Sequence, residues 1–286
     1  MSAPHNDANF GIGTLCMISI CVKNLNKRYR ARDGDVPALA DVDIEVREGE
    51  FVTIVGPSGC GKSTLLYILG GFLGADGGTI EVNGKAVTGP GVDRGIVFQE
   101  YALFPWLTVA QNIRYGLEMS GTSAKQCEEI VERLVRTIGL QGFEHRFPRE
   151  LSGGMKQRVA IARTLAYDPK ILLLDEPFGA LDALTREGMQ DELLRLWQAT
   201  RKTVVMVTHD VNEAVYLSGR VLVMSQRPGR IVQEFPVTID RSGEREVTVL
   251  NDDFNHLRNE VWLAVRRQAG ANAGANPGAS GAAREG

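Results

Sequence analysis

Two kinds of apolar pattern alternate along the chain. Continuous apolar runs at residues 171–174 and 204–207 are typical of central parallel strands that are covered on both faces. Apolar positions at helical spacing instead mark residues 125–138 and the stretch that follows Ser152. A short helix is expected at residues 65–69, and the other segments that we interpret as strands are 18–22, 51–55, 78–84, 95–98, 221–224 and 231–235. This alternation predicts an α/β core with a mostly parallel sheet.

The two ends of the chain lack these patterns. Residues 1–16 show no periodicity and are expected to be a disordered lead, and Met17, which begins the first apolar run, competes with Met1 as the start codon. Residues 268–286 are expected to be a disordered tail, because they are rich in Ala and Gly and have too little apolar mass to offset the entropy of ordering. Residues 241–267 predict an amphipathic helical extension that either packs on the domain or contacts a partner.

Composition narrows the class of protein. The 286 residues carry a formal charge of −3, which argues against a dominant role in binding nucleic acid, because phosphate backbones require clustered Lys and Arg. No apolar run approaches the roughly 20 residues that span a bilayer, and the polar start of the chain is unlike a secretory signal. We therefore expect a cytoplasmic protein that serves a membrane only by docking on another protein. The cysteines form no CxxC pair and are expected to be reduced thiols: Cys16, Cys21, Cys60 and Cys127.

A glycine-rich loop predicts nucleotide binding. The segment from Gly56 to Ser63 fits the pattern GxxxxGK[ST] and lies between a predicted strand and a predicted helix, as that motif requires. Its glycines allow backbone N–H groups to surround phosphate oxygens, and the helix that follows adds the positive end of its dipole. We expect Lys62 to contact the β- and γ-phosphates and Ser63 to bind Mg²⁺ through its hydroxyl. The predicted nucleotide-binding residues of this loop are Gly56, Pro57, Ser58, Gly59, Cys60, Gly61, Lys62, Ser63 and Thr64.

Two carboxylates follow the apolar run at residues 171–174. Asp175 ends the predicted strand, where catalytic groups of such sheets gather, and is expected to hold Mg²⁺. Glu176 is expected to face away from it, because successive strand residues face opposite sides. It can then position or deprotonate the attacking water. Taken alone, an Asp-Glu pair after a strand is equally well a solvated loop start, but the phosphate loop upstream favours the catalytic interpretation.

A third segment reads Leu151-Ser152-Gly153-Gly154-Met155. Ser152 suits the N-cap of the helix predicted behind it, and the two glycines leave the N–H groups of that helix end uncovered. The segment predicts a second anion-binding site in the same polypeptide. A capped helix without a ligand is the simpler alternative for these residues in isolation.

Taken in this order, the three motifs resemble those of the ATP-binding subunit of an ABC transporter, over roughly residues 20–240. The resemblance implies a P-loop NTPase fold of the ABC ATPase type, with a mostly parallel central sheet and an antiparallel β subdomain. It also implies a helical subdomain at approximately residues 100–165 that carries the Ser152 segment. These parts would form a nucleotide-binding domain of residues 17–240.

The resemblance also implies how such a subunit works. It binds ATP and Mg²⁺, with two ATP molecules sandwiched between two nucleotide-binding domains, so that Ser152, Gly153 and Gly154 cap the γ-phosphate held by the other protomer. A chain with one phosphate loop then needs a second copy or a sister subunit. Its further partners would be an integral membrane permease and, indirectly, a periplasmic or lipid-anchored substrate-binding protein. The subunit would lie peripherally on the cytoplasmic face of the inner membrane.

Four single residues acquire roles through the same resemblance. Gln99 matches the glutamine that links the metal and the attacking water to the transporter interface, and His209 matches the switch histidine that contacts the γ-phosphate. Tyr29 matches the aromatic side chain that stacks on adenine, although a single tyrosine often serves packing alone. Asp182 matches the loop that crosses the dimer seam, where Gly179 departs from the commoner serine and removes one hydroxyl.

The segment from Thr88 to Val109 looks like the nitrate, sulfonate and taurine branch of bacterial importers. We rank a sulfonate or taurine first and nitrate second as cargo, and related members of the branch serve pyrimidine precursors and bicarbonate. Phe104, Pro105 and Trp106 either belong to ordinary core packing or form an apolar groove that receives a permease helix.

Other classes of ATPase fit less well. A soluble ABC-type ATPase of DNA repair or translation would carry a long coiled-coil insertion or two nucleotide domains in one chain. A GTPase would show an NKxD-type motif after the phosphate loop, whereas Asn26 and Lys27 precede it. An exporter half-transporter would carry its membrane span in the same chain.

Overall fold

The computed structural model describes residues 17–31, 34–241 and 243–270, so the expected lead at residues 1–16 lies outside it. Its larger sheet has six strands in the order β10-β9-β3-β8-β7-β6. Five of them are parallel, and β10 alone pairs antiparallel, with β9. The prediction of a mostly parallel central sheet is therefore confirmed. The strands are β3 (Phe51–Val55), β6 (Arg94–Val97), β7 (Ile171–Asp175), β8 (Thr203–Thr208), β9 (Arg220–Met224) and β10 (Ile231–Pro236).

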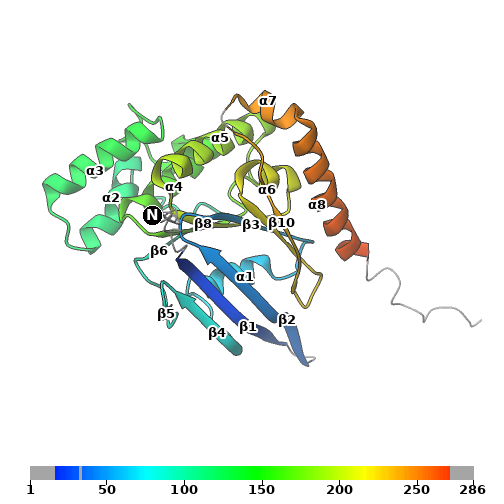
Figure 1. Cartoon of the computed structure of the whole chain (residues 1–286). Coiled ribbons are helices and arrows are strands. Elements are labelled where there is room, and N and C mark those ends of the chain that lie inside the picture. Colours follow the sequence, from blue (N-terminus) through cyan, green and yellow to red (C-terminus); the bar gives the residue numbers. More distant parts are fainter. Residues whose placement is uncertain (1–16, 32–33, 242, 271–286) are drawn as a thin grey trace, which may run out of the picture.

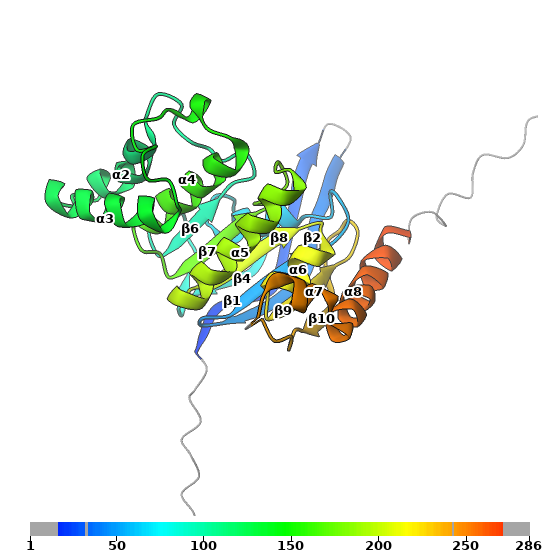
Figure 2. The ribbon, with the colours of Figure 1, turned by 90° about the horizontal axis from the view of Figure 1, so that it is seen from above.

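The central strands are mostly apolar because both faces of the sheet are buried. In β7, Leu172 and Leu174 belong to one hydrophobic cluster, whereas Ile171 and Leu173 belong to the other. Alternate residues of a strand face opposite sides, so a strand between two layers needs apolar side chains at every position. Figure 2 shows α5 (Ala183–Thr200) and α6 (Val211–Leu217) lying over this sheet.

A second, antiparallel sheet of four strands has the order β2-β1-β4-β5, which confirms the antiparallel β subdomain. β1 is much longer than the short strand expected at residues 18–22. β2 was not predicted at all, although Val42, Ile44 and Val46 alternate as buried positions with exposed neighbours, which is the signal of a half-buried strand. The strands are β1 (Ile18–Ala31), β2 (Gly34–Arg47), β4 (Gly77–Val82) and β5 (Lys85–Ala86).

Three helices, with a short 3₁₀ turn at Pro148–Glu150, gather on one side of the molecule (Figure 1). They are α2 (Val109–Met119), α3 (Ala124–Thr137) and α4 (Gly153–Ala166). The helical spacing at residues 125–138 predicted α3 closely, whereas α2, α5 and α6 were not predicted. On the opposite side of the larger sheet, α1 (Lys62–Leu69) packs in the same cluster as the antiparallel sheet.

The chain continues after β10 into α7 (Arg245–Leu250) and α8 (Asp252–Gly270). α8 buries Phe254, Val261 and Ala264 in the cluster that contains α6, so it packs on the domain. The boundary expected for the disordered tail was wrong for residues 268–270, because the helix continues to Gly270. Residues 271–286 of that tail lie outside the described residues.

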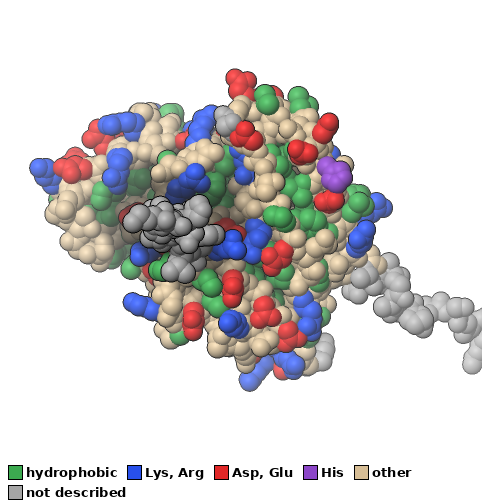
Figure 3. Space-filling model, in the orientation of Figure 1, with side chains coloured by type: hydrophobic (Ala, Val, Ile, Leu, Met, Phe, Trp, Pro, Cys, Tyr) green, Lys and Arg blue, Asp and Glu red, His purple; other side chains and the backbone are tan. Residues whose placement is uncertain are grey.

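The surface drawn in Figure 3 mixes acidic and basic side chains, in keeping with the small net charge. Across residues 17–31, 34–241 and 243–270, the helices do not combine the length and the apolar character that crossing a membrane requires. The three cysteines within these residues, Cys21, Cys60 and Cys127, are free thiols. Cys16 lies outside them.

Candidate functional site

The loop between β3 and α1 has a backbone that requires glycine. Gly59 and Gly61 have φ angles of 74° and 111°, which L side chains rarely adopt. At Gly56, a Cβ atom would lie 2.9 Å from the carbonyl oxygen of Met224, and at Gly61 it would lie 2.8 Å from Leu39 Cδ2. Gly59 and Gly61 therefore adopt backbone angles that would strain other residues, and Gly56 and Gly61 leave no room for a side chain. The loop leads directly into the first turn of α1.

Lys62, the first residue of α1, returns its ammonium group into this loop. Its Nζ donates to the carbonyl oxygens of Gly56 at 2.9 Å and of Pro57 at 3.0 Å, and the side chain is buried. Cys60 lies beside it, and burial raises the pKa of the Cys60 thiol. A buried ammonium held by carbonyl oxygens places positive charge within the loop, as a phosphate site requires.

Tyr29 reaches the same loop from β1. Its hydroxyl lies 3.1 Å from Thr64 Oγ1, and 42% of the residue is exposed. The ring therefore borders the start of α1 rather than filling the core. This placement fits an aromatic platform beside the phosphate loop better than it fits ordinary packing.

Asp175 meets Ser63 across the site. Ser63 Oγ donates to Asp175 Oδ1 at 2.8 Å, and Asp175 is buried at the end of β7. Burial and a hydrogen bond to Asp175 raise the pKa of Tyr67 to about 12. A carboxylate beside a hydroxyl supplies the hard oxygen ligands that Mg²⁺ takes when phosphates complete its shell, so these residues fit that metal.

Glu176 turns toward His209 instead. Its Oε2 lies 3.1 Å from His209 Nδ1, while its own backbone N–H donates to the carbonyl oxygen of Val207 in β8. The reason that the sequence suggested for its direction was wrong, because Glu176 lies beyond the strand and has φ 42°. A left-handed turn, rather than strand alternation, separates the two carboxylates, and such backbone strain is concentrated at functional sites.

These side chains meet at the carboxyl ends of β3, β7 and β8. We call Lys62, Ser63, Asp175, Glu176 and His209 the strand-end site. Ligands of open α/β sheets bind at this edge. The site therefore brings together a cation, a metal-type ligand pair and a carboxylate that is paired with an imidazole, which are the groups needed to bind a triphosphate and to activate water.

Residues 151–155, the signature segment, make different contacts. Ser152 Oγ accepts from the N–H of Met155 at 3.3 Å and caps α4 as predicted. A Cβ atom on Gly154 would overlap the methyl group of Thr185, in the first turn of α5. Asp182 caps that helix by accepting from the N–H of Thr185 at 3.1 Å. The signature segment is thus packed against the Asp182 loop.

Gln99 lies in the exposed loop after β6. The loop continues through Tyr101 and Ala102, which have φ angles of 55° and 48°. Arg163 of α4 donates to both of their carbonyl oxygens, at 3.2 Å and 2.6 Å. The strained loop that follows Gln99 is therefore tied to the helix that carries the signature segment.

The apolar loop that follows is hydrogen-bonded to a buried asparagine and exposes apolar side chains to solvent. Asn112 is fully buried, accepts from the N–H of Phe104 at 2.9 Å and donates to the carbonyl oxygen of Leu107 at 2.9 Å. Trp106 is 70% exposed and packs at 5.6 Å, centroid to centroid, on Phe104, and Pro105 is exposed as well. These residues are not ordinary core packing.

Sequence reasoning missed several residues beside the strand-end site. Thr208, Asp210 and Glu213 surround the segment that carries His209, and Tyr67 borders Asp175. The available signal was Asp210, an N-cap residue type placed directly before the apolar positions of α6.

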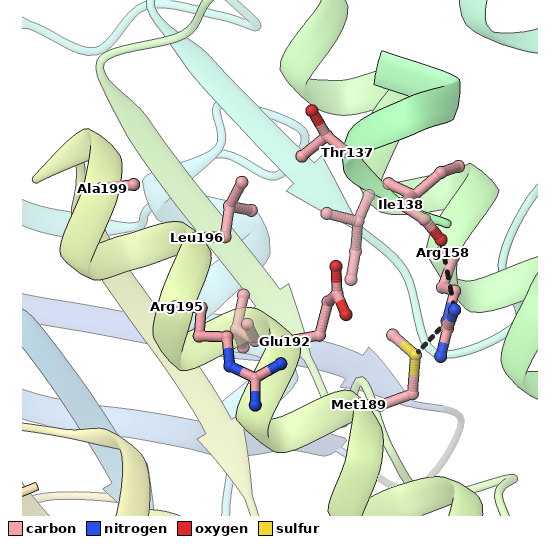
Figure 4. A pocket seen from close by; sticks show the side chains of 10 residues that line it. Thr137, Ile138, Arg158, Met189, Glu192, Arg195, Leu196 and Ala199 are labelled. Carbon is pink, nitrogen blue, oxygen red and sulfur yellow. Dashed lines mark hydrogen bonds between the residues drawn. The ribbon is translucent and has the colours of Figure 1, made fainter. Parts of the chain in front are cut away.

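An apolar cavity of about 240 Å³ lies between α3, α4 and α5, away from these residues (Figure 4). Arg158 lines one edge of it, donating to the carbonyl oxygen of Ile138 at 3.2 Å and to Met189 Sδ at 3.1 Å. None of the predicted nucleotide-binding residues lines it. Arg158 thus joins α4 both to the end of α3 and to α5.

Comparisons with known proteins show which family the chain resembles. Residues 39–179 match the family model described as ABC transporter. The chain is 50% identical to the nitrate import ATP-binding protein NrtD of Synechocystis sp. (strain ATCC 27184 / PCC 6803 / Kazusa), over 79% of this chain and 84% of that protein. It is 48% identical to the taurine import ATP-binding protein TauB of Roseobacter denitrificans (strain ATCC 33942 / OCh 114), over 88% of this chain and 92% of that protein.

Among solved structures, the chain is similar to MJ0796, described as a bacterial ABC transporter cassette of dimeric structure. The two share 35% sequence identity with a TM-score of 0.69, over 76% of this chain and 98% of that one.

Proposed function

The chain belongs to the ABC transporter family and is an ATPase of that type, and we propose that it powers a bacterial importer of a small anion. The observation that carries the proposal is the strand-end site, where Lys62, the Ser63–Asp175 pair and the Glu176–His209 pair meet at one sheet edge. Motifs alone leave these groups scattered over more than a hundred residues. Their convergence supplies the arrangement that ATP hydrolysis requires.

In this proposal the phosphate loop holds ATP. The backbone N–H groups of the loop and the Lys62 ammonium bind the β- and γ-phosphates, and the α1 dipole adds to the attraction. The Tyr29 ring, which lies beside Thr64, stacks on adenine. Ser63, Asp175 and the amide oxygen of Gln99 would hold Mg²⁺, which neutralises charge on the phosphates when it is bound.

Glu176 acts on the attacking water. Its carboxylate positions the water or takes its proton, a role that is typically worth about 10² to 10⁴ in rate. The contact with His209 Nδ1 fixes the carboxylate, while the imidazole presents its other nitrogen for the γ-phosphate. Asp175 cannot replace Glu176, because it is buried and already accepts from Ser63.

Two copies, or this chain and a sister subunit, would complete the site. Ser152, Gly153 and Gly154 expose the N–H groups of α4 for the γ-phosphate of a nucleotide that the partner holds. Asp182, packed beside Gly154 through Thr185, would lie at the seam between the two. The dimeric description of MJ0796 supports this assembly.

A permease would dock on the exposed aromatic loop. Trp106 and Pro105 offer an apolar surface, and the buried Asn112 fixes the loop by hydrogen bonds to its backbone. This loop follows Gln99 and is hydrogen-bonded by Arg163 to α4. A movement of α4 would therefore be transmitted to the permease. The subunit would then lie peripherally on the cytoplasmic face of the inner membrane, with a substrate-binding protein as an indirect partner.

The cargo is proposed as a sulfonate or taurine first and nitrate second. Relatives named for taurine and nitrate import support the choice of small anions, and no observation favours the alternative of an ATPase in DNA repair or translation. The test is a pull-down from solubilised native membranes with the Glu176→Gln chain and Mg-ATP. A multi-span permease should co-purify, and ribosomal or repair proteins in its place would contradict the importer.

A further inference from the structure

Hydrogen bonds hold the residues on both sides of His209, and the Thr208–Glu213 bond among them is buried. Thr208 Oγ1 donates to Glu213 Oε2 at 2.7 Å and accepts from the N–H of Asp210 at 3.0 Å. Asp210 in turn caps α6, its carboxylate accepting from the N–H groups of Asn212 at 2.7 Å and of Glu213 at 3.2 Å. The residues immediately before and after His209 are therefore both fixed.

His209 itself is held far less. Its side chain is 59% exposed, and its contact within the strand-end site is the one with Glu176 Oε2. A side chain with so little packing takes its direction from its backbone. The backbone of Thr208 and Asp210 thus decides where the imidazole lies.

Burying the side chain of Glu213 carries a free-energy cost when its carboxylate is ionised. The residue is 5% exposed, and burial raises the pKa of its carboxyl group. A buried charge is retained only where hydrogen bonds compensate for lost hydration, and a hydrogen bond in such surroundings is strong and directional. The Thr208 hydroxyl supplies this compensation, and the same hydroxyl orients the Asp210 N–H.

We propose that Thr208 and Glu213 are positioning residues for His209, and that their hydrogen bond sets the imidazole against Glu176. This inference rests on the proposed roles of His209 and Glu176 in hydrolysis. Neither Thr208 nor Glu213 touches the reacting groups, so both act through the histidine.

The test compares two identical changes at buried threonines. Thr208→Val removes the hydroxyl that bonds Glu213, whereas Thr53→Val, on the neighbouring strand β3, removes a buried hydroxyl without a hydrogen-bond partner. In the full chain, Thr208→Val should lower kcat for ATP hydrolysis about tenfold, the expected effect of losing one charge-assisted hydrogen bond. The KM for ATP should stay unchanged, because the Lys62 loop is intact, and Thr53→Val should keep both constants.

Coupling to the histidine separates positioning from general loss of structure. In a His209→Ala background, Thr208→Val should cost little further, because the residue on which it acts is gone. An equal loss in both backgrounds, or wild-type kcat in Thr208→Val, would overturn the proposal.

Misfolding of Thr208→Val and failure of the proposed function can each be told apart from failure of this inference. If Thr208→Val does not fold, Glu213→Gln carries the test, since a neutral acceptor weakens the bond. It should lower kcat several-fold with KM unchanged, and wild-type kcat there would also overturn the inference. Absence of hydrolysis by the unmodified chain would instead contradict the proposed function.

Discussion

The strand-end site and the signature segment differ in where their contacts lie. In the first, side chains at or just beyond the ends of three strands meet one another, as Ser63 meets Asp175 and Glu176 meets His209. In the second, Ser152 caps its own helix, and the glycines pack against α5 and the Tyr101 loop. One chain thus assembles the groups that we propose bind a triphosphate and activate water, while the contacts of the signature segment, the proposed second anion-binding element, are made with other parts of the chain. Four predictions probe this contrast.

The largest effect is expected within the strand-end site. Glu176→Gln keeps the size of the side chain but removes the base, so ATP hydrolysis should fall by about 10² to 10⁴-fold while ATP binding persists. Steady-state hydrolysis and equilibrium nucleotide binding on the same protein measure both. Glu187→Gln, on the exposed face of α5, is the matched control, because it makes the same change outside the site and should hydrolyse ATP normally.

A smaller effect is expected at the surface that would meet the permease. Trp106→Ala removes an exposed aromatic anchor, and such anchors are typically worth about 2 kcal/mol or more in an interface. Retention of the chain on permease-containing membranes should fall correspondingly. Trp262→Ala, a change at another exposed tryptophan, on α8, is the matched control, and equal loss with both variants would contradict the assignment of the docking surface.

A substitution in the signature segment should lower the stability of the fold by disturbing its packing. Gly154→Ala forces a methyl group onto Thr185, and such overpacking costs typically about 1 to 3 kcal/mol. Thermal unfolding should show the loss, and ATP-driven dimer formation should weaken. Gly188→Ala in α5 meets open space and should instead stabilise the helix by roughly 0.5 to 1 kcal/mol. Similar stability of the two variants would contradict the packing account.

The smallest effect concerns pH. Because burial raises the pKa of Glu213 above its ordinary 4.5, this group contributes stability below that pH and loses the contribution as pH rises through the folded pKa. Asp210 raises this pKa further, whereas Arg186 and His209 lower it.

Glu213→Gln does not titrate. Its stability relative to the wild type should therefore increase as pH rises from about 4 to about 7, as followed by chemical denaturation. A constant difference across that range would contradict the direction of the shift.

The sequence predicted the parts of the fold that two-sided burial of a strand, or one buried face of a helix, makes regular. β7, β8 and α3 were located because their apolar positions follow one period throughout. β2 was missed because its alternation is confined to residues 42–46. α5 was missed although Met189 and Leu193 are one helical turn apart, because its buried face also includes polar Gln190 while apolar Leu184 is exposed.

The site was predicted less completely than its motifs. The loop glycines and Lys62 follow from local spacing, but the Glu176–His209 contact depends on a left-handed turn and on two strands becoming neighbours. The Thr208–Glu213 bond likewise depends on how α6 leaves β8. Tertiary placement of polar side chains leaves little trace in residue order.

The most direct test of a site shared between two chains is a mixing experiment. A Lys62→Ala chain and a Ser152→Glu chain, both carrying Glu176→Gln to retain ATP, are mixed and then separated by size. In a dimer of either chain alone, each shared site lacks either an intact Lys62 loop or an intact Ser152 segment. Mixed, they form one site in which the Lys62 loop and the Ser152 segment are both intact. We predict ATP-dependent dimers with one bound nucleotide only in the mixture, and a mixture that forms no more dimer than the separate chains would contradict the account.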